Sequence, residues 1–102
     1  GQGYNITYPL SRGSGDDPFM EKLDHAFDEI EDFDADMLVI ALGLDAFEGD
    51  PFAGLSITTE GYNRMARIIS KRTTTPILMV QEGGYICDEL GDNLVSFLDG
   101  IE

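Results

Sequence analysis

The chain has 102 residues, the size of a single domain, and its hydrophobic content of 42% is ordinary for a globular protein. Its 20 acidic residues against 6 basic ones give a formal net charge of −14, which repels phosphate backbones and excludes nucleic acid as a primary partner. No apolar stretch is long enough to cross a bilayer, so we expect no membrane partner and a cytoplasmic location. The acidity is typical of a solvated surface, and it could also attract a cationic substrate.

The first part of the chain predicts a strand followed by a helix. Residues 4–10 are rich in β-branched and aromatic side chains and contain a proline near their end, which predicts a strand. A turn-rich loop over residues 11–17 follows. Asp17 with Pro18 is a typical helix start, with Asp as the N-cap residue. Apolar residues then recur at helical spacing as far as Phe33.

The remainder of the chain alternates strands and helices. Residues 36–43 contain a run of consecutive apolar residues, the pattern of a parallel strand covered on both faces. A helix capped by Thr58 or Thr59 is expected next, because both side chains can accept a hydrogen bond from the first helical turn. A strand over residues 76–81 and a last helix from about Asp88 complete the pattern.

These elements predict an α/β fold, a parallel sheet with flanking helices in the order β-α-β-α-β-α. No repeat or linker divides the sequence, so we expect residues 1–102 to form a single domain. A sheet of three strands would leave two edges unpaired, a liability for a free-standing monomer. The chain starts close to a predicted strand and stops at a predicted helix, so we expect both ends to be cuts through a larger fold.

Asp45 is the first candidate for chemistry, since it follows a predicted strand and Gly43. The carboxyl ends of parallel strands are where open α/β sheets bind ligands, and a carboxylate there can hold a metal. An aspartate in such a loop can equally cap neighbouring backbone amides. Glu48 and Asp50 lie nearby but lack the spacing of a calcium loop, and Asp50 before Pro51 is typical of a turn.

Tyr85 is the second candidate, because it follows the next predicted strand and the pair Gly83 and Gly84. Two glycines permit a tight turn and a close approach of the backbone to a ligand. The phenol could donate a hydrogen bond to a developing oxyanion, or it could simply pack half-buried at the strand end. The only histidine, His25, is expected on the solvated face of a helix, and the only cysteine, Cys87, is expected to be an inert thiol.

Three linked segments of the sequence resemble one known family. They are Leu-Gly-Leu-Asp-Ala-Phe-Glu-Gly-Asp-Pro at residues 42–51, Leu-Ser-Ile-Thr-Thr-Glu-Gly-Tyr at 55–62, and 76–85, which ends in Glu-Gly-Gly-Tyr. Their order and spacing are similar to the C-terminal part of the zinc-dependent deacetylases, the histone deacetylase and acetylpolyamine amidohydrolase family. Residues 4–10 also look like the family segment that precedes them. The resemblance implies a partial arginase/deacetylase-like α/β fold.

The resemblance also implies roles for individual residues. Asp45 matches the third zinc ligand of the family, and Tyr85 matches the tyrosine that stabilises the tetrahedral oxyanion. Gly83 and Gly84 match backbone that lines the channel for acetyl-lysine or acetylpolyamine. In such enzymes zinc polarises the amide carbonyl and activates a water, and histidines relay a proton to the leaving amine.

Other parts of the family site are missing from this sequence. The Asp-x-His motif that supplies two zinc ligands and the paired catalytic histidines are both absent. We therefore expect the C-terminal segment of a longer zinc-dependent deacetylase, inactive alone because its zinc site is incomplete. The alternative is a non-catalytic, stand-alone remnant that forms a homo-oligomer through exposed sheet edges. A small flavodoxin-like or receiver-type domain would also fit the element order, but this sequence lacks a phosphate-binding loop and an acidic pair after the first strand.

Overall fold

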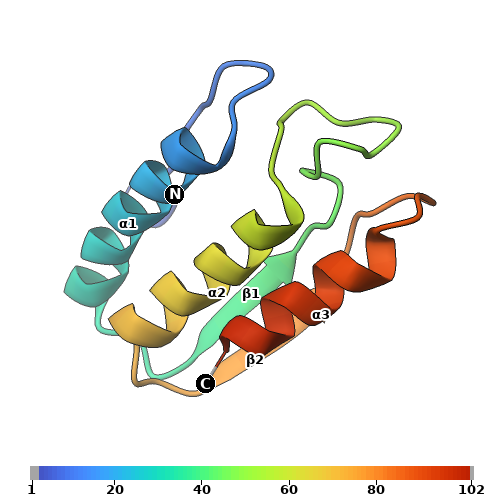
Figure 1. The fold of residues 1–102 in the computed structure, drawn as a ribbon. Coiled ribbons are helices and arrows are strands. Elements are labelled where there is room, and N and C mark those ends of the chain that lie inside the picture. The colour runs from blue at the N-terminus through green and yellow to red at the C-terminus, as the bar shows by residue number, and fades with distance from the viewer. Residues whose placement is uncertain (1–2, 102) are drawn as a thin grey trace.

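The structure is a computed structural model that describes residues 3–101 of the chain. Within this range the elements follow in the order α1 (Asp16–Phe33), β1 (Leu38–Leu42), α2 (Thr59–Arg72), β2 (Ile77–Gln81) and α3 (Leu90–Gly100). Figure 1 shows β1 and β2 lying behind α2 and α3. The predicted α/β class is thereby confirmed, and no helix between residues 3 and 101 combines the length and apolar composition needed to cross a bilayer.

The two strands pair in parallel, from Leu38 opposite Ile77 to Leu42 opposite Gln81. Backbone hydrogen bonds continue this ladder past the ends of both strands. The Glu82 N–H donates to the Leu42 carbonyl (2.9 Å), and the Leu44 N–H donates to the Gly83 carbonyl (2.9 Å). The chain segments that leave β1 and β2 are therefore held side by side at one edge of the sheet.

The predicted strand over residues 4–10 is wrong, because the described part of this segment is irregular. The element order is consequently α-β-α-β-α, and the sheet of residues 3–101 has two strands. β-branched and aromatic residues favour a strand only where a neighbouring strand offers hydrogen bonds and packing. Here the segment passes along α1 instead, and the ring of Tyr4 packs edge-on against Phe33 with centroids 6.3 Å apart.

Both helix starts in the first half of the fold meet at a single carboxylate. Helix α1 begins at Asp16 with Gly15 as its N-cap, so the prediction of Asp17 as N-cap was wrong. Asp16 accepts hydrogen bonds from the Thr58 N–H (2.9 Å) and hydroxyl (2.6 Å). Thr58 in turn caps α2, as predicted, by accepting from the Gly61 N–H (2.9 Å). The chain of contacts ties the start of α1 to the start of α2.

Replacing Asp16 with alanine should lower the free energy of unfolding by about 1–3 kcal/mol, since two hydrogen bonds from Thr58 lose their acceptor. Asp17→Ala is the matched control, because that carboxylate is exposed and makes a surface ion pair with Arg64 (3.0 Å) worth about 0–1 kcal/mol. Urea unfolding of both variants measures the difference. Equal losses for the two aspartates would contradict a specific role for Asp16.

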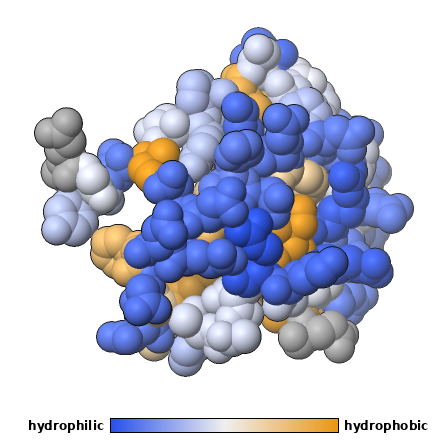
Figure 2. Space-filling view, turned by 90° about the vertical axis from the view of Figure 1, so that its left-hand side faces the viewer, coloured by the Kyte–Doolittle hydropathy of each residue, from blue (hydrophilic) through white to orange (hydrophobic). Residues whose placement is uncertain are grey.

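Arg72, at the end of α2, fastens the other end of α1. Its guanidinium contacts Asp24 (2.5 Å), Asp28 (2.6 Å) and Glu31 (3.1 Å), which lie one helical turn apart on α1. The hydrogen bond that Arg72 donates to Asp28, followed by those to Glu31 and Asp24, raises the pKa of Arg72 above its ordinary value. Figure 2, which looks onto the α1 side of the molecule, shows that most of this face is hydrophilic. His25 on α1 is exposed, so its predicted surface position is confirmed.

The core lies between the helices and one face of the sheet. Helix α2 is central to it, with Tyr62 and Ala66 fully buried, and Leu42 is buried at the end of β1. The opposite face of the sheet, with Val39, Leu78 and others, is exposed. The prediction that β1 is covered on both faces is therefore wrong for residues 3–101, because the helices described here supply a single covering layer.

Candidate functional site

The four residues singled out from the sequence gather at the carboxyl edge of the sheet. Asp45 lies three residues beyond β1, and Gly83, Gly84 and Tyr85 follow β2 closely. The hydrogen bond from the Leu44 N–H to the Gly83 carbonyl (2.9 Å) joins the two segments directly. Two motifs that are far apart in sequence thus form a single site because parallel strands end at the same edge.

The carboxylate of Asp45 lies against two glycines, one from each segment. A Cβ atom at Gly83 would stand 2.6 Å from Oδ2 of Asp45, and a Cβ atom at Gly43 would stand 2.7 Å from Oδ1. Real Cβ atoms do not approach oxygen so closely, so neither position accepts a side chain while the carboxylate stays in place. The glycine that sequence reasoning associated with a substrate channel therefore also makes room for Asp45.

The carboxylate of Asp45 is exposed and takes part in no hydrogen bond or ion pair with residues 3–101. Among the described residues, Asp45 therefore does not cap nearby backbone amides, which was the alternative to a ligand role. Beneath the loop, the buried Tyr62 donates its hydroxyl to the Gly43 carbonyl (3.3 Å). Burial raises the pKa of the Tyr62 phenol above its ordinary value, and the charge of Asp45 raises it further, so this phenol stays neutral.

Gly84 and Tyr85 form the second half of the site. Gly84 has a φ of +133°, a backbone conformation that other residues rarely adopt, and a Cβ there would also lie 2.9 Å from the Cβ of Leu44. Tyr85 is 46% exposed, and its ring packs edge-on against Phe52 with centroids 4.8 Å apart. The described residues leave its hydroxyl without a hydrogen bond, so the phenol is available to a ligand.

Asp50 links the two halves, and its role in the site was missed from the sequence. It is only 6% exposed, and its Oδ2 accepts a hydrogen bond from the Phe52 N–H (2.8 Å). This bond closes the turn that was predicted to start at Asp50. Its Oδ1 accepts from the Tyr85 N–H (3.1 Å), 35 residues away. A local pattern indicates the turn, but nothing local indicates the partner across the sheet edge.

The residues described here do not complete a metal site. Between residues 3 and 101 no group of three histidine, cysteine or acidic side chains comes close enough together to hold an ion. Asp45 offers one exposed carboxylate, whereas both oxygens of Asp50 already accept hydrogen bonds from backbone N–H groups. A catalytic zinc needs three protein ligands and an open position, so this part of the chain fits one ligand of such a site and not the whole.

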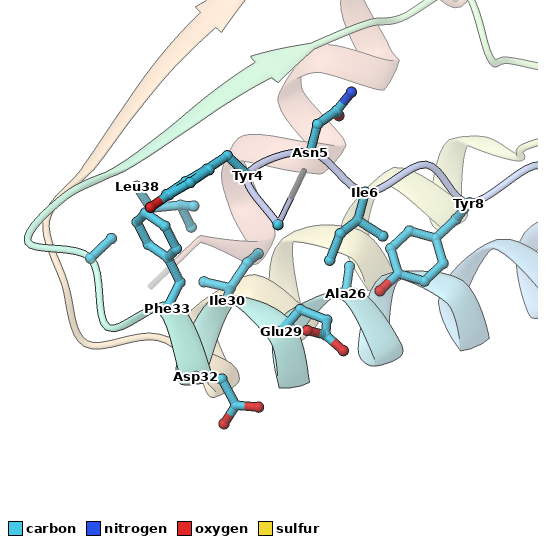
Figure 3. A pocket seen from close by; sticks show the side chains of 12 residues that line it. Tyr4, Asn5, Ile6, Tyr8, Ala26, Glu29, Ile30, Asp32, Phe33 and Leu38 are labelled. Carbon is cyan, nitrogen blue, oxygen red and sulfur yellow. The ribbon is translucent and has the colours of Figure 1, made fainter. Parts of the chain in front are cut away.

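A pocket of about 590 Å³ lies away from this edge, between the irregular segment at residues 3–8 and α1. Figure 3 shows Tyr4, Ile6 and Tyr8 on one side of it and Ile30 and Phe33 of α1 on the other. Its lining includes two acidic residues of α1 and is otherwise largely apolar, with none of the candidate site residues among them. The pocket therefore offers no support for chemistry at Asp45 or Tyr85.

Comparison with known proteins identifies the class. Residues 1–101 match the model of the histone deacetylase domain. The chain is 38% identical over 100 residues to acetylpolyamine amidohydrolase of Burkholderia pseudomallei, covering 98% of this chain and 29% of that protein. It is 39% identical over 102 residues to acetylpolyamine amidohydrolase 1 of Pseudomonas aeruginosa, covering 100% of this chain and 29% of the relative.

A solved structure gives the same result. A crystal structure of acetylpolyamine aminohydrolase from Burkholderia pseudomallei superposes with a TM-score of 0.87 at 38% identity, covering 95% of this chain and 28% of that one. The chain therefore belongs to the histone deacetylase domain family, and the resemblance seen in the three sequence segments is confirmed. It spans 29% of the length of these curated relatives, so it corresponds to part of a deacetylase domain.

Proposed function

We propose that this chain is the segment of a zinc-dependent deacetylase that supplies one zinc ligand, Asp45, and the oxyanion-stabilising side chain, Tyr85. The observation that carries the proposal is the pairing of an exposed, unpartnered carboxylate with a half-exposed phenol at one sheet edge. Family membership supports it, since the relatives named above are acetylpolyamine amidohydrolases. Each side chain is free to bind a ligand, the Asp45 carboxylate lies in space left by Gly43 and Gly83, and Tyr85 follows a turn at Gly84 with a φ of +133°.

Asp45 would hold the metal through a carboxylate oxygen, with the remaining ligands coming from the rest of a longer protein. When bound, zinc supplies a Lewis acid for the amide carbonyl and lowers the pKa of a bound water. The part played by this chain is to fix the carboxylate. Gly43 and Gly83 leave it the space between the two strand ends, and the neutral Tyr62 beneath it places no second charge there.

Tyr85 would donate a hydrogen bond from its phenol to the oxygen that becomes negative when the amide is attacked. Such a donor is effective when its position is set before the reaction, because no reorganisation is then required. The tight turn at Gly84 and the contact with the Phe52 ring restrict where the phenol can lie. Gly83 and Gly84 would line the channel along which the acetylated amine enters.

The substrate class we propose is an acetylated amine, an acetylpolyamine or an acetyl-lysine side chain. The net charge of −14 favours substrates whose remaining amines are protonated, because an acidic surface raises the local concentration of cations. A polyamine carries several such amines on a thin, flexible chain. The names of the relatives in Burkholderia pseudomallei and Pseudomonas aeruginosa agree with this choice.

The proposal is tested by comparing the 102-residue chain with the native gene product, whose length an intact mass measurement in the source cell establishes. The purified chain should show no zinc-dependent release of acetate from acetylpolyamine or acetyl-lysine peptide, because one ligand does not hold a catalytic zinc. A native product several times longer should be active with added zinc. Robust zinc-dependent deacetylation by the short chain would contradict the proposal.

A stand-alone module is the second candidate, and the exposed face and edges of the two-stranded sheet favour it. An apolar sheet face with Val39 and Leu78 invites association with a second copy of the chain. In that case the native product would be about as long as the chain described here. Sedimentation would then give a homodimer or a larger oligomer, and this species would unfold cooperatively. An aggregation-prone, partly disordered monomer would instead favour the segment of a longer enzyme.

A further inference from the structure

We propose that Asp50 is a positioning residue for Tyr85, an inference that rests on the function proposed above for that tyrosine. Asp50 touches Tyr85 through the main chain and not through the phenol, so it would act on the reaction through Tyr85 alone. No role beyond a local turn follows for Asp50 from its sequence context.

Asp50 is a buried carboxylate with no cation beside it among residues 3–101: its exposed fraction is 6%, and it forms no ion pair there. A buried carboxylate is costly unless its oxygens accept hydrogen bonds. Both do so here, from the N–H groups of Phe52 (2.8 Å) and Tyr85 (3.1 Å). The acceptor is therefore fixed on two sides, and it fixes its donors in return.

At the end of the sheet the backbone leaves the strand ladder. The last ladder bonds between the segments are those from Glu82 to Leu42 and from Leu44 to Gly83. Beyond them Gly84 turns the chain at a φ of +133°, and the Tyr85 N–H leaves the ladder and donates to Asp50. The carboxylate thus replaces a strand neighbour as the anchor of the turn.

An aromatic contact also connects the loop of Asp50 to Tyr85. The same carboxylate holds the main chain of Phe52, and the Phe52 ring packs edge-on on the Tyr85 ring at 4.8 Å. One side chain therefore sets both members of the pair. Two consecutive glycines before Tyr85 give the turn wide conformational freedom, so an anchor is needed to hold the phenol in one place. Misplacement of a reacting group by 1 Å can cost about 100-fold in rate.

The test of position is a double-mutant cycle in the longer deacetylase that carries this segment. Asp50→Ala should lower kcat by about 10-fold to 100-fold with little change in KM, and Asp50→Asn should lower it less, because its one oxygen still accepts one of the two bonds. In the Tyr85→Phe background, Asp50→Ala should change kcat by less than about 2-fold. Glu48→Gln, which removes an exposed charge from the same loop, is the matched control and should leave kcat unchanged.

The cycle has outcomes that overturn the inference. An equal loss of kcat for Asp50→Ala in both backgrounds would show an effect that does not pass through Tyr85. A rise in KM alone, or no loss at all, would overturn it as well. Full activity of Tyr85→Phe is a different result, because it removes the proposed role of the tyrosine and leaves the anchor itself to be decided by a second measurement.

That second measurement follows amide hydrogen exchange in the longer deacetylase that carries this segment, and it requires no activity. Asp50→Ala should speed exchange of the Tyr85 and Phe52 N–H groups by about 10-fold or more while the amides of α2 keep their protection. If that variant loses protection throughout, Asp50→Asn supplies the comparison in a folded chain. Unchanged exchange at Tyr85 in a folded variant would overturn the inference whatever the activity assays give.

Discussion

Asp45→Ala should strip zinc from the longer enzyme and abolish deacetylation with it. Outer partners of metal ligands typically contribute 10-fold to 100-fold to affinity, so removal of a direct ligand is expected to weaken zinc binding by at least about 100-fold. The fold should survive, because the carboxylate is exposed and makes no hydrogen bond or ion pair with residues 3–101. The measurement is the zinc content of the purified protein together with its rate of acetate release.

The control for Asp45→Ala is Glu48→Gln, which changes the charge of the same exposed loop by one unit without removing the candidate ligand. It should retain both zinc and activity. Zinc content and the rate of acetate release are compared for each variant. A variant at position 45 that keeps stoichiometric zinc but loses activity would mean that Asp45 acts on substrate, and the assignment of this carboxylate as a ligand would be wrong.

Tyr85→Phe should lower kcat by roughly 100-fold to 1,000-fold, the usual cost of removing one donor to an oxyanion. Zinc content should stay at the native level, because the phenol is not a candidate ligand. The substitution removes a hydroxyl group that makes no hydrogen bond with the described residues, and it keeps the ring that packs on Phe52. A loss of rate therefore reports chemistry and not unfolding.

Tyr4→Phe is the matched control for the same atomic change at an exposed phenol outside the site, beside the pocket along α1. It should leave kcat and KM as they are. For Tyr85→Phe, the loss is expected in kcat and not in KM. A change confined to KM would mean that the phenol binds substrate and transition state equally, and the proposed role at the oxyanion would have to be abandoned.

The elements that follow Phe33 were predictable from sequence because local signals and tertiary packing agree there. The apolar run after Asp36 forms β1, Thr58 caps α2, and α3 begins at Leu90, two residues later than expected. The failure lies at residues 4–10, whose composition favours a strand but which pair with no strand in the described chain. Strand formation needs a partner, and the composition of one segment does not report whether a partner exists.

The candidate site likewise contains residues that were predictable from the sequence and residues that were not. Asp45 and Tyr85 were found because each follows a predicted strand, and parallel topology brings strand ends together. Asp50 and Tyr62 were missed because their contacts with Tyr85 and Gly43 span 35 and 19 residues. No periodicity or turn preference carries such a pairing. The Tyr85 N–H reaches the Asp50 carboxylate because the fold places the two loops side by side.

The packing of Asp45 on its two glycines has a consequence for how this protein can evolve. One oxygen lies 2.7 Å from where a Cβ of Gly43 would stand, and the other lies 2.6 Å from that of Gly83. A mutation that adds a side chain at either glycine displaces the carboxylate, even though position 45 itself is unchanged. Loss of the carboxylate removes the nearest contact that a new side chain at either glycine would meet, whereas a descendant that keeps the carboxylate in place must keep the space at both glycines.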